Sequence, residues 1–251
     1  MNRAIFITVR TGSSRLPQKA LKEICGAPAI VQLIRRVRHS VMAEGIVLCT
    51  TELPEDDILV EIAKNEEIGF FRGSVKDKLI RWHGAASQFK VEFFVTADGD
   101  DLLCEPELID LAFRQYERES PDFIEGTGLV CGSFTYGIKA SALSKVCEIK
   151  DSEDTEMMWV YFKDTGLFEC AELKDVPDIF KRPEIRMTLD YEDDLRFFRT
   201  IFNHFKGGYA GLREVIEYLD QHPDVIKINQ YLQERFLENQ KKRTTLILKR
   251  K

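Results

Sequence analysis

Apolar runs alternate with amphipathic stretches along the first 120 residues of the chain. Four runs have the length and the β-branched or aromatic content of buried strands, and we expect strands at Ala4–Val9, Gly45–Thr50, Ile68–Phe71 and Val91–Ala97. Helices are expected at Pro28–Ser40, Pro54–Glu66, Val75–Phe89 and Glu107–Arg118. This alternation predicts an α/β fold with a mostly parallel sheet and helices on both faces. Ligands of such sheets bind at the carboxyl ends of the strands.

The second half of the chain has shorter and less regular segments. We expect extended strands within Asp122–Lys139 and at Leu167–Leu173, Glu184–Leu189 and Thr244–Leu248, and short helices at Ala140–Glu148 and Asp154–Lys163. Longer helices are expected at Tyr191–Phe205, Gly211–Asp220 and Ile228–Gln240, and a solvated tail at Lys249–Lys251. The sequence shows no repeat or clear linker. It therefore predicts a single domain over residues 1–251, with a helical C-terminal portion from about residue 190.

Composition and charge exclude several classes of protein. The 251 residues are 44% hydrophobic and 31% charged, as in ordinary globular proteins. A net charge of −6 argues against a nucleic-acid binder. No apolar run approaches the roughly 20 residues that span a bilayer, and the first residues do not resemble a cleavable signal. Six cysteines without a Cys-x-x-Cys pair indicate neither a disulfide framework nor a zinc site. We expect a cytoplasmic protein that binds neither nucleic acid nor membrane.

A glycine- and serine-rich turn with three cations follows the first apolar run. It reads Arg10-Thr-Gly12-Ser13-Ser14-Arg15-Leu16-Pro17-Gln-Lys19, and no acidic residue precedes Glu23. Backbone N–H groups in the turn can bind phosphate oxygens, and the three cations can neutralise phosphate charge. The segment is not a Walker A loop, because no Gly-Lys-Ser/Thr closes it. A solvated polar turn is the alternative, but three cations in a net-negative chain favour a polyphosphate site.

This segment resembles the signature Arg-x-Gly-Ser-x-Arg-Leu-Pro-x-Lys of the cytidylyltransferases that make CMP-activated acidic sugars. That family includes the acylneuraminate, 3-deoxy-octulosonate and spore-coat polysaccharide types. The resemblance implies a single-domain, three-layer, Rossmann-like nucleotidyltransferase fold with CTP as substrate. It implies catalytic roles for Arg10, Arg15 and Lys19, and nucleotide contacts from Gly12, Ser13 and Ser14.

Three carboxylates follow the expected strand Val91–Ala97, in the sequence Asp98-Gly-Asp100-Asp101. A polyphosphate site needs a divalent cation, usually Mg²⁺, held by oxygen ligands. A polar turn would have the same composition. The segment resembles the family's Gly-Asp-x-Pro-Leu-Ile-Asp-Pro-Glu-Leu-Ile, whose first Asp binds the metal, although Ala97 replaces Gly and two residues are inserted. The resemblance implies Asp98 as a Mg²⁺ ligand, with Asp100 sharing that role.

A fourth carboxylate, Asp190, lies where an alternating segment meets an acidic helix start. It could cap the helix, with the acids after it complementing the helix dipole. The segment also resembles the family's Thr-x-Asp-x-x-Glu-Asp-Leu, whose first Asp is the other metal ligand. The resemblance implies that role for Asp190, and the two interpretations stay open together.

The segment Arg72–Arg81 resembles the family's Arg-Gly-x-x-x-Asp-Val-Leu-x-Arg, which lies beside the base and ribose. It implies nucleotide contacts from Arg72, Gly73 and Arg81. The residues alone indicate a turn with Ser74 as the cap of the next helix. The resemblance extends from about residue 3 to about residue 230, where Ile226–Asn229 also matches.

The function implied is transfer of CMP from CTP to a small anionic acceptor, with release of pyrophosphate, in the synthesis of a surface polysaccharide such as a capsule or lipopolysaccharide. The acceptor is expected to be an acidic sugar or a phosphorylated metabolite, bound by residues 126–139 and 151–156. Lys139 or Lys181 and Arg182 could meet its charge. A phosphate acceptor would give a CDP-linked product. A nucleotide-binding protein without turnover, or an enzyme using GTP or UTP, are the other possibilities. The enzymes that the sequence resembles are usually dimers, so the resemblance implies a homodimer.

Overall fold

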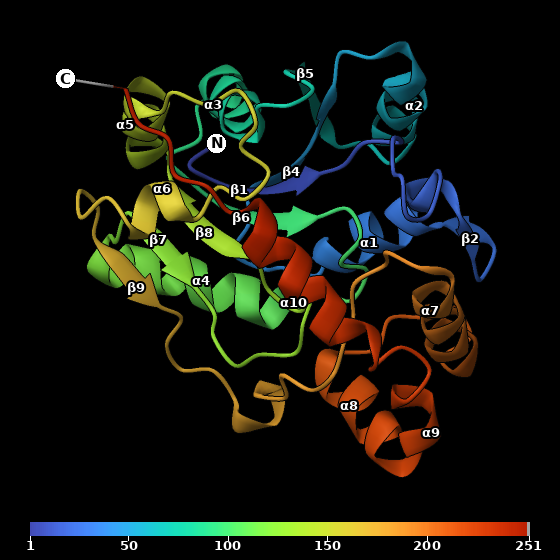
Figure 1. The fold of residues 1–251 in the computed structure, drawn as a ribbon. Helices are drawn as coiled ribbons and strands as arrows, with labels where there is room; N and C mark the ends of the chain where they lie inside the picture. The colour runs from blue at the N-terminus through green and yellow to red at the C-terminus, as the bar shows by residue number, and fades with distance from the viewer. Residues whose placement is uncertain (250–251) are drawn as a thin grey trace.

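A seven-stranded sheet runs through the computed structural model, which describes residues 1–249 (Figure 1). Its strand order is β5-β4-β1-β6-β8-β7-β9. The strands are β1 Arg3–Thr8, β4 Gly45–Thr51, β5 Gly69–Gly73, β6 Phe93–Asp98, β7 Phe123–Glu125, β8 Tyr136–Lys139 and β9 Cys170–Glu172. β5, β4, β1 and β6 are parallel neighbours, whereas β8 runs antiparallel to both β6 and β7. The predicted mostly parallel sheet is confirmed.

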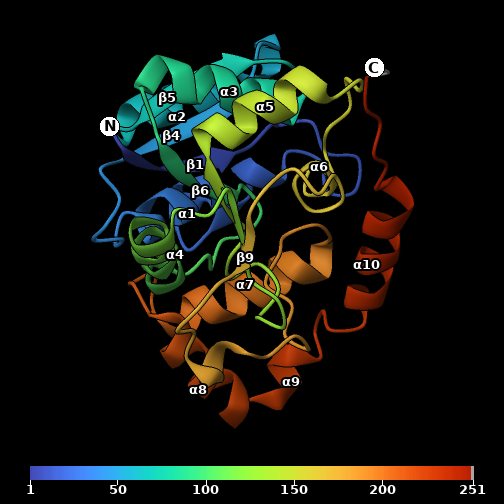
Figure 2. The same ribbon diagram turned by 90° about the vertical axis from the view of Figure 1, so that its left-hand side faces the viewer.

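Helices cover both faces of the sheet (Figure 2). They are α1 Ala29–Val37, α2 Asp57–Asn65, α3 Lys78–Phe89, α4 Pro106–Glu119, α5 Ala140–Ile149, α6 Val160–Lys163, α7 Glu192–His204, α8 Leu212–Gln221, α9 Pro223–Ile226 and α10 Leu232–Arg243. Three short 3₁₀ turns, η1 Lys19–Leu21, η2 Pro54–Asp56 and η3 Asp178–Phe180, and a small hairpin of β2 Glu23–Ile24 and β3 Ala27–Pro28 complete the described elements. No helix within residues 1–249 has the length and apolar character that crossing a membrane requires.

The central strand β1 shows why the fold has two cores. Its side chains alternate between the faces: Ala4 and Phe6 pack with α3, α5 and α6, whereas Ile5 and Ile7 pack with α1, α2 and α4. All four side chains are fully buried. Burial on both faces explains the continuous apolar run in the sequence.

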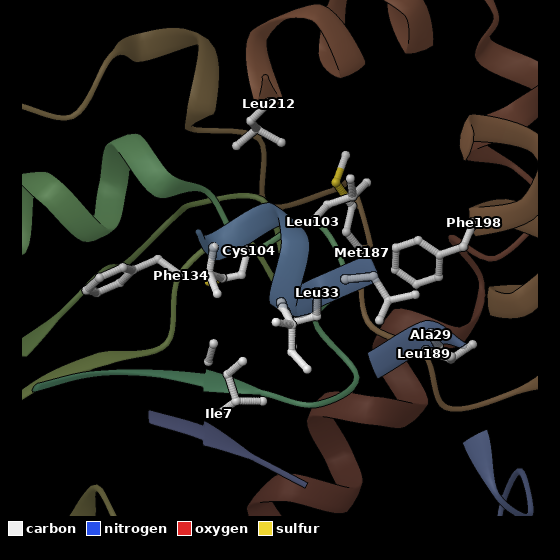
Figure 3. Packing of buried hydrophobic residues seen from close by; sticks show 14 of the residues in the cluster. Ile7, Ala29, Leu33, Leu103, Cys104, Phe134, Met187, Leu189, Phe198 and Leu212 are labelled. Atoms are coloured by element: carbon white, nitrogen blue, oxygen red, sulfur yellow. The ribbon is translucent and has the colours of Figure 1, made fainter. Parts of the chain in front are cut away.

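The segment before α7 is part of the larger core, although it is not the strand that its alternating pattern predicts. Met187 and Leu189 lie among Leu33 of α1 and Phe198 of α7 (Figure 3). The backbone of the segment forms only one isolated bridge, between Arg186 and Cys131. The predicted strand Glu184–Leu189 is therefore wrong, because packing against helices, not sheet pairing, buries its apolar side chains.

Three further boundaries differ from the prediction. The helix expected from Asp154 begins only at Val160, because the Thr155 hydroxyl is held by Asp77 and by the N–H of Leu79, at 2.9 and 3.1 Å. The helix expected from Ile228 begins at Leu232. The expected strand Thr244–Leu248 has a single bridge, from Leu248 to Lys150, and the tail residues 250–251 lie outside the described residues.

The helix caps also correct one detail. Asp77, not Ser74, caps α3, since its carboxylate accepts a hydrogen bond from the N–H of Ile80 at 3.1 Å. Ser74 instead accepts from the N–H of Asp77 at 3.1 Å. The cap fixes where α3 begins, which places Lys78 in its first turn.

A buried network around Asp194 joins three segments of the C-terminal half. Its carboxylate accepts hydrogen bonds from Arg186 Nε at 2.9 Å and from Asn229 Nδ2 at 2.9 Å. It also accepts from the N–H groups of Asp190 and Tyr191, at 2.9 and 3.0 Å. The side chains of Arg186 and Asp194 are fully buried. The network therefore fixes the backbone at Asp190.

We predict that Asp194→Ala lowers the free energy of unfolding by about 3–5 kcal/mol, because it leaves the buried Arg186 charge without its main partner. Glu192→Ala is the matched control, since Glu192 lies in the same helical turn but is exposed, and it should change stability by about 0.5 kcal/mol or less. Urea denaturation measures both. A loss below about 1 kcal/mol for Asp194→Ala would contradict the role of the network.

Candidate active site

The Arg10–Lys19 loop leaves the carboxyl end of β1 and is held at both ends. The Thr11 N–H and hydroxyl both donate to Asp56 Oδ1, at 2.7 Å each, which fastens the loop to η2. At its other end, Lys19 begins η1. Within residues 1–249, no protein acceptor pairs with the N–H groups of Gly12, Ser13 or Ser14. The turn therefore keeps donors available for a ligand.

These residues face a cavity of about 210 Å³, called here the loop cavity. Its charged and loop residues are Arg10, Gly12, Ser13, Ser14, Arg15, Lys19, Lys78, Arg81, Asp98, Asp100 and Glu156. A second cavity of about 330 Å³, called here the distal cavity, adjoins it. The distal cavity lies between the 126–136 loop, residues 156–159 and α10. Figures 1 and 2 show α10 running past this side of the sheet.

Asp190 contacts the cations of the loop, although more than 170 residues separate them in the sequence. Its Oδ1 accepts from Arg15 Nη2 at 2.6 Å and from Lys19 Nζ at 2.8 Å. Lys19 also contacts Asp100. Asp190 is fully buried, and it does not cap α7, because Tyr191 occupies the cap position. The capping interpretation is wrong, and the Asp190 carboxylate is directed at the loop.

The charges of this cluster stabilise one another. Burial works against the charged form of Lys19, but Asp100 and Asp190 raise the pKa of Lys19 above its ordinary value. Burial likewise works against ionised Asp190, but Lys19 and Arg15 lower the pKa of Asp190 below its ordinary value. Asp190 is therefore a carboxylate and Lys19 an ammonium at neutral pH.

Asp98 ends β6 and lies level with Thr8 of β1, so it emerges beside the start of the loop. Its Oδ1 contacts Lys78 Nζ at 3.0 Å. Burial raises the pKa of Asp100, and the charges of Asp190 and Asp98 add to this effect against the pull of Lys19. Burial together with Asp100 and Asp98 raises the pKa of Asp101 well above its ordinary value. The carboxylates of the site therefore lie close enough together to disfavour one another's ionisation.

The carboxylates fit a hard divalent cation in part. Within residues 1–249, no three His, Cys, Asp or Glu side chains are arranged as a preformed metal site. The predicted trio Asp98, Asp100 and Asp190 is thus not a closed cage. Mg²⁺ usually binds one or two carboxylates and completes its shell with phosphate oxygens and water. Asp98 and Asp190, which both line the distal cavity and both contact a cationic side chain, suit that kind of site.

The predicted nucleotide contacts divide into two groups. Arg81 lines the loop cavity, is 4% exposed, and has a buried Nε without a hydrogen-bond partner among the described residues. Arg72 instead donates to the carbonyls of Thr51 and Leu53, at 3.0 and 2.9 Å. Neither Arg72 nor Gly73 lines either cavity. This placement argues against a nucleotide contact for these two residues.

Several residues of the site were not singled out from the sequence. Lys78 lines both cavities, and Gln233 and Phe236 of α10 line the distal cavity. Glu156, which also lines both cavities, belongs to the segment 151–156 that was expected at the acceptor. Lys78 directly follows the loop after a parallel strand, which is a signal that sequence reasoning could have used. The approach of α10 has no such signal, because its position depends on tertiary packing.

Cations and unpaired N–H groups opposite carboxylates, at the carboxyl ends of parallel strands, suit a metal-bound nucleoside triphosphate. The fold and the site thus define a nucleotidyltransferase.

The comparison with known proteins makes the assignment specific. The model of the cytidylyltransferase family matches residues 4–242, so the chain belongs to this family of nucleotidyltransferase enzymes. The spore coat polysaccharide biosynthesis protein SpsF of Bacillus subtilis is 25% identical over 234 residues, which are 89% of this chain and 97% of that protein. A 3-deoxy-manno-octulosonate cytidylyltransferase of Chlorobium chlorochromatii is 31% identical over 121 residues, 48% of each chain. The family resemblance predicted from the loop is confirmed.

Solved structures agree with the fold. A cytidylyltransferase from Leptospira borgpetersenii is 25% identical and has a TM-score of 0.79, covering 90% of this chain and 97% of that one. The CMP:2-keto-3-deoxy-manno-octonic acid synthetase, solved in complex with CTP, has a TM-score of 0.62 at 15% identity, covering 82% of this chain and 100% of that one. The second likeness concerns the fold alone. The predicted α/β nucleotidyltransferase fold is confirmed.

Proposed function

We propose that the chain transfers CMP from CTP to a small acceptor and releases pyrophosphate. The observation that carries this proposal is the contact of Arg15 and Lys19, which line the loop cavity, with Asp190, which lines the distal cavity. This contact supports the proposal, because it brings two cations that can bind phosphate next to a carboxylate that can bind a metal. Membership of the cytidylyltransferase family supports CTP as the nucleotide.

In this proposal each part of the site has a defined task. Arg10, Arg15 and Lys19, with the free N–H groups of the Gly12–Ser14 turn, hold the β- and γ-phosphates, and Arg81 contacts the nucleoside end. Asp98 and Asp190 would hold Mg²⁺, which supplies charge neutralisation at the phosphates, and Asp100 keeps Lys19 in place. An acceptor oxygen attacks the α-phosphorus, the bond to the β-phosphate oxygen breaks, and pyrophosphate leaves with that oxygen.

The distal cavity is the proposed acceptor site. Tyr136 and Trp159 form part of its wall, with ring centroids 6.4 Å apart, and offer an apolar face to a sugar or other small metabolite. Lys139 and the Lys181–Arg182 pair line neither cavity, so they do not support the expected acceptor contact. The charge of an anionic acceptor would have to meet Arg15 or Lys78, the cations on the described wall of that cavity.

The nature of the nucleophile bears on the product. A hydroxyl acceptor would need a general base, and the carboxylates of Asp101 and Glu156 on the wall of the distal cavity are candidates. A phosphate acceptor would need no base, because its nucleophilic oxygen is already ionised, and it would give a CDP-linked product. A role in surface polysaccharide synthesis is supported by the similarity to the spore coat polysaccharide biosynthesis protein SpsF. A cytoplasmic homodimer stays a prediction.

We predict pyrophosphate release when the protein is incubated with Mg²⁺, CTP and a panel of sugar acids and phosphorylated alcohols. Replacing CTP by ATP, GTP or UTP should lower kcat/KM by about 10²-fold or more, since a site that hydrogen-bonds one base leaves its polar groups unpaired with another. A coupled pyrophosphate assay measures the rates. Equal rates with all four nucleotides would refute the cytidylyl assignment. Binding of CTP without release for any acceptor would instead favour a nucleotide-binding protein without turnover.

We also predict that Arg15→Ala and Lys19→Ala each lower turnover by about 10²–10³-fold, because each removes a cation that stabilises the leaving pyrophosphate. Lys22→Ala is the matched control, since Lys22 follows η1 but lines neither cavity, and it should retain turnover. Circular dichroism should show the same fold in all three variants. Wild-type turnover in Arg15→Ala would remove the loop from the mechanism.

A further inference from the structure

The loop cavity and the distal cavity share part of their walls. The residues common to both are Arg15, Lys78, Asp98, Asp100 and Glu156. Two of the five are cations, and they come from different parts of the fold. Arg15 belongs to the loop after β1, whereas Lys78 is the first residue of α3, after β5. The junction between the cavities therefore brings two cations from different segments next to three carboxylates.

The proposed function, on which this inference rests, assigns the nucleotide to the loop cavity and the acceptor to the distal cavity. A group transferred from one to the other must pass through the junction. The α-phosphate is the only part of CTP that forms a bond with the acceptor. It must therefore lie at the junction when the reaction occurs, next to the residues common to both cavities.

The environment of Lys78 suits a ligand contact better than a structural one. Its side chain is 8% exposed, its Nζ contacts Asp98 Oδ1 at 3.0 Å, and it lies 5.1 Å from the centre of the Trp82 ring. An ammonium group has three N–H donors, and the ion pair with Asp98 engages one.

The position of Lys78 in α3 also favours a ligand contact. A cation in the first turn of a helix faces the positive end of the helix dipole, which is unfavourable. The motif that this segment resembles has Val, not Lys, at this place. The chain thus puts a buried charge where local helix preferences oppose it, at the junction of two cavities.

We propose that Lys78 binds the α-phosphate of the nucleotide and so contacts the phosphoryl group that is transferred. Arg15 and Lys19 hold the phosphates that leave, whereas Lys78 holds the phosphate that stays with the cytidine. On arrival of the nucleotide, the Lys78 ammonium donates to an α-phosphate oxygen with the donors that Asp98 does not use.

Ligands that differ in their number of phosphate groups test this assignment without an acceptor. Calorimetric titration with cytidine, CMP and CTP, in excess magnesium chloride, separates the contribution of the α-phosphate from that of the β- and γ-phosphates together. Lys78→Met should lower the affinity for CMP by about tenfold or more while leaving the affinity for cytidine nearly unchanged, because a hydrogen bond to a charged group is lost. Lys19→Met should show the reverse pattern, with most of its loss confined to CTP.

Two further variants complete the test. Lys76→Met removes the same charge from an exposed position two residues before Lys78 and should leave all three affinities unchanged. Lys78→Arg keeps a cation at the junction and should retain the preference for CMP over cytidine. Equal losses for cytidine and CMP in Lys78→Met, or no loss for either, would overturn the proposal. Failure of the wild-type protein to bind CTP would instead overturn the proposed function, so the two failures are distinct.

Discussion

The site depends on the ion pairs that the buried Asp190 carboxylate forms with Arg15 and Lys19. A buried carboxylate is costly unless cations and hydrogen bonds compensate it. Asp190 has both, because Arg186 approaches its Oδ2 at 3.4 Å and Asp194 binds its backbone N–H. The same contact joins two distant parts of the chain. Arg15 and Lys19 belong to the loop after β1, and Asp190 belongs to the segment that leads into the C-terminal helices.

This balance of charge also explains how the site can admit a nucleotide. Lys19 and Lys78 neutralise Asp190 and Asp98 in the described structure. When a substrate binds, the two lysines can pair with its phosphates and the two carboxylates can pair with its metal ion. No charge is then left without a partner. Because both lysines have flexible stems, such an exchange needs side-chain movement and no rearrangement of the sheet.

Much of the fold was predictable, because the strands of the first half are buried on both faces and their helices are amphipathic. The Arg10–Lys19 loop was predictable for a different reason, since its motif is local. Glu184–Leu189 shows the limit of pattern reading, because apolar alternation specifies which side chains are buried and not what covers them. Arg72 lines neither cavity, and Lys78 and α10 were not singled out, because tertiary contacts decide which residues face a cavity.

A crystal structure of the protein soaked with CTP and magnesium tests the central claim most directly. The account predicts one triphosphate in the loop cavity, with its β- and γ-phosphate oxygens within hydrogen-bond distance of Arg15 and Lys19, and a metal ion between the phosphates and Asp190. A triphosphate bound elsewhere, or one that leaves the Arg15–Asp190 and Lys19–Asp190 ion pairs undisturbed, would contradict it.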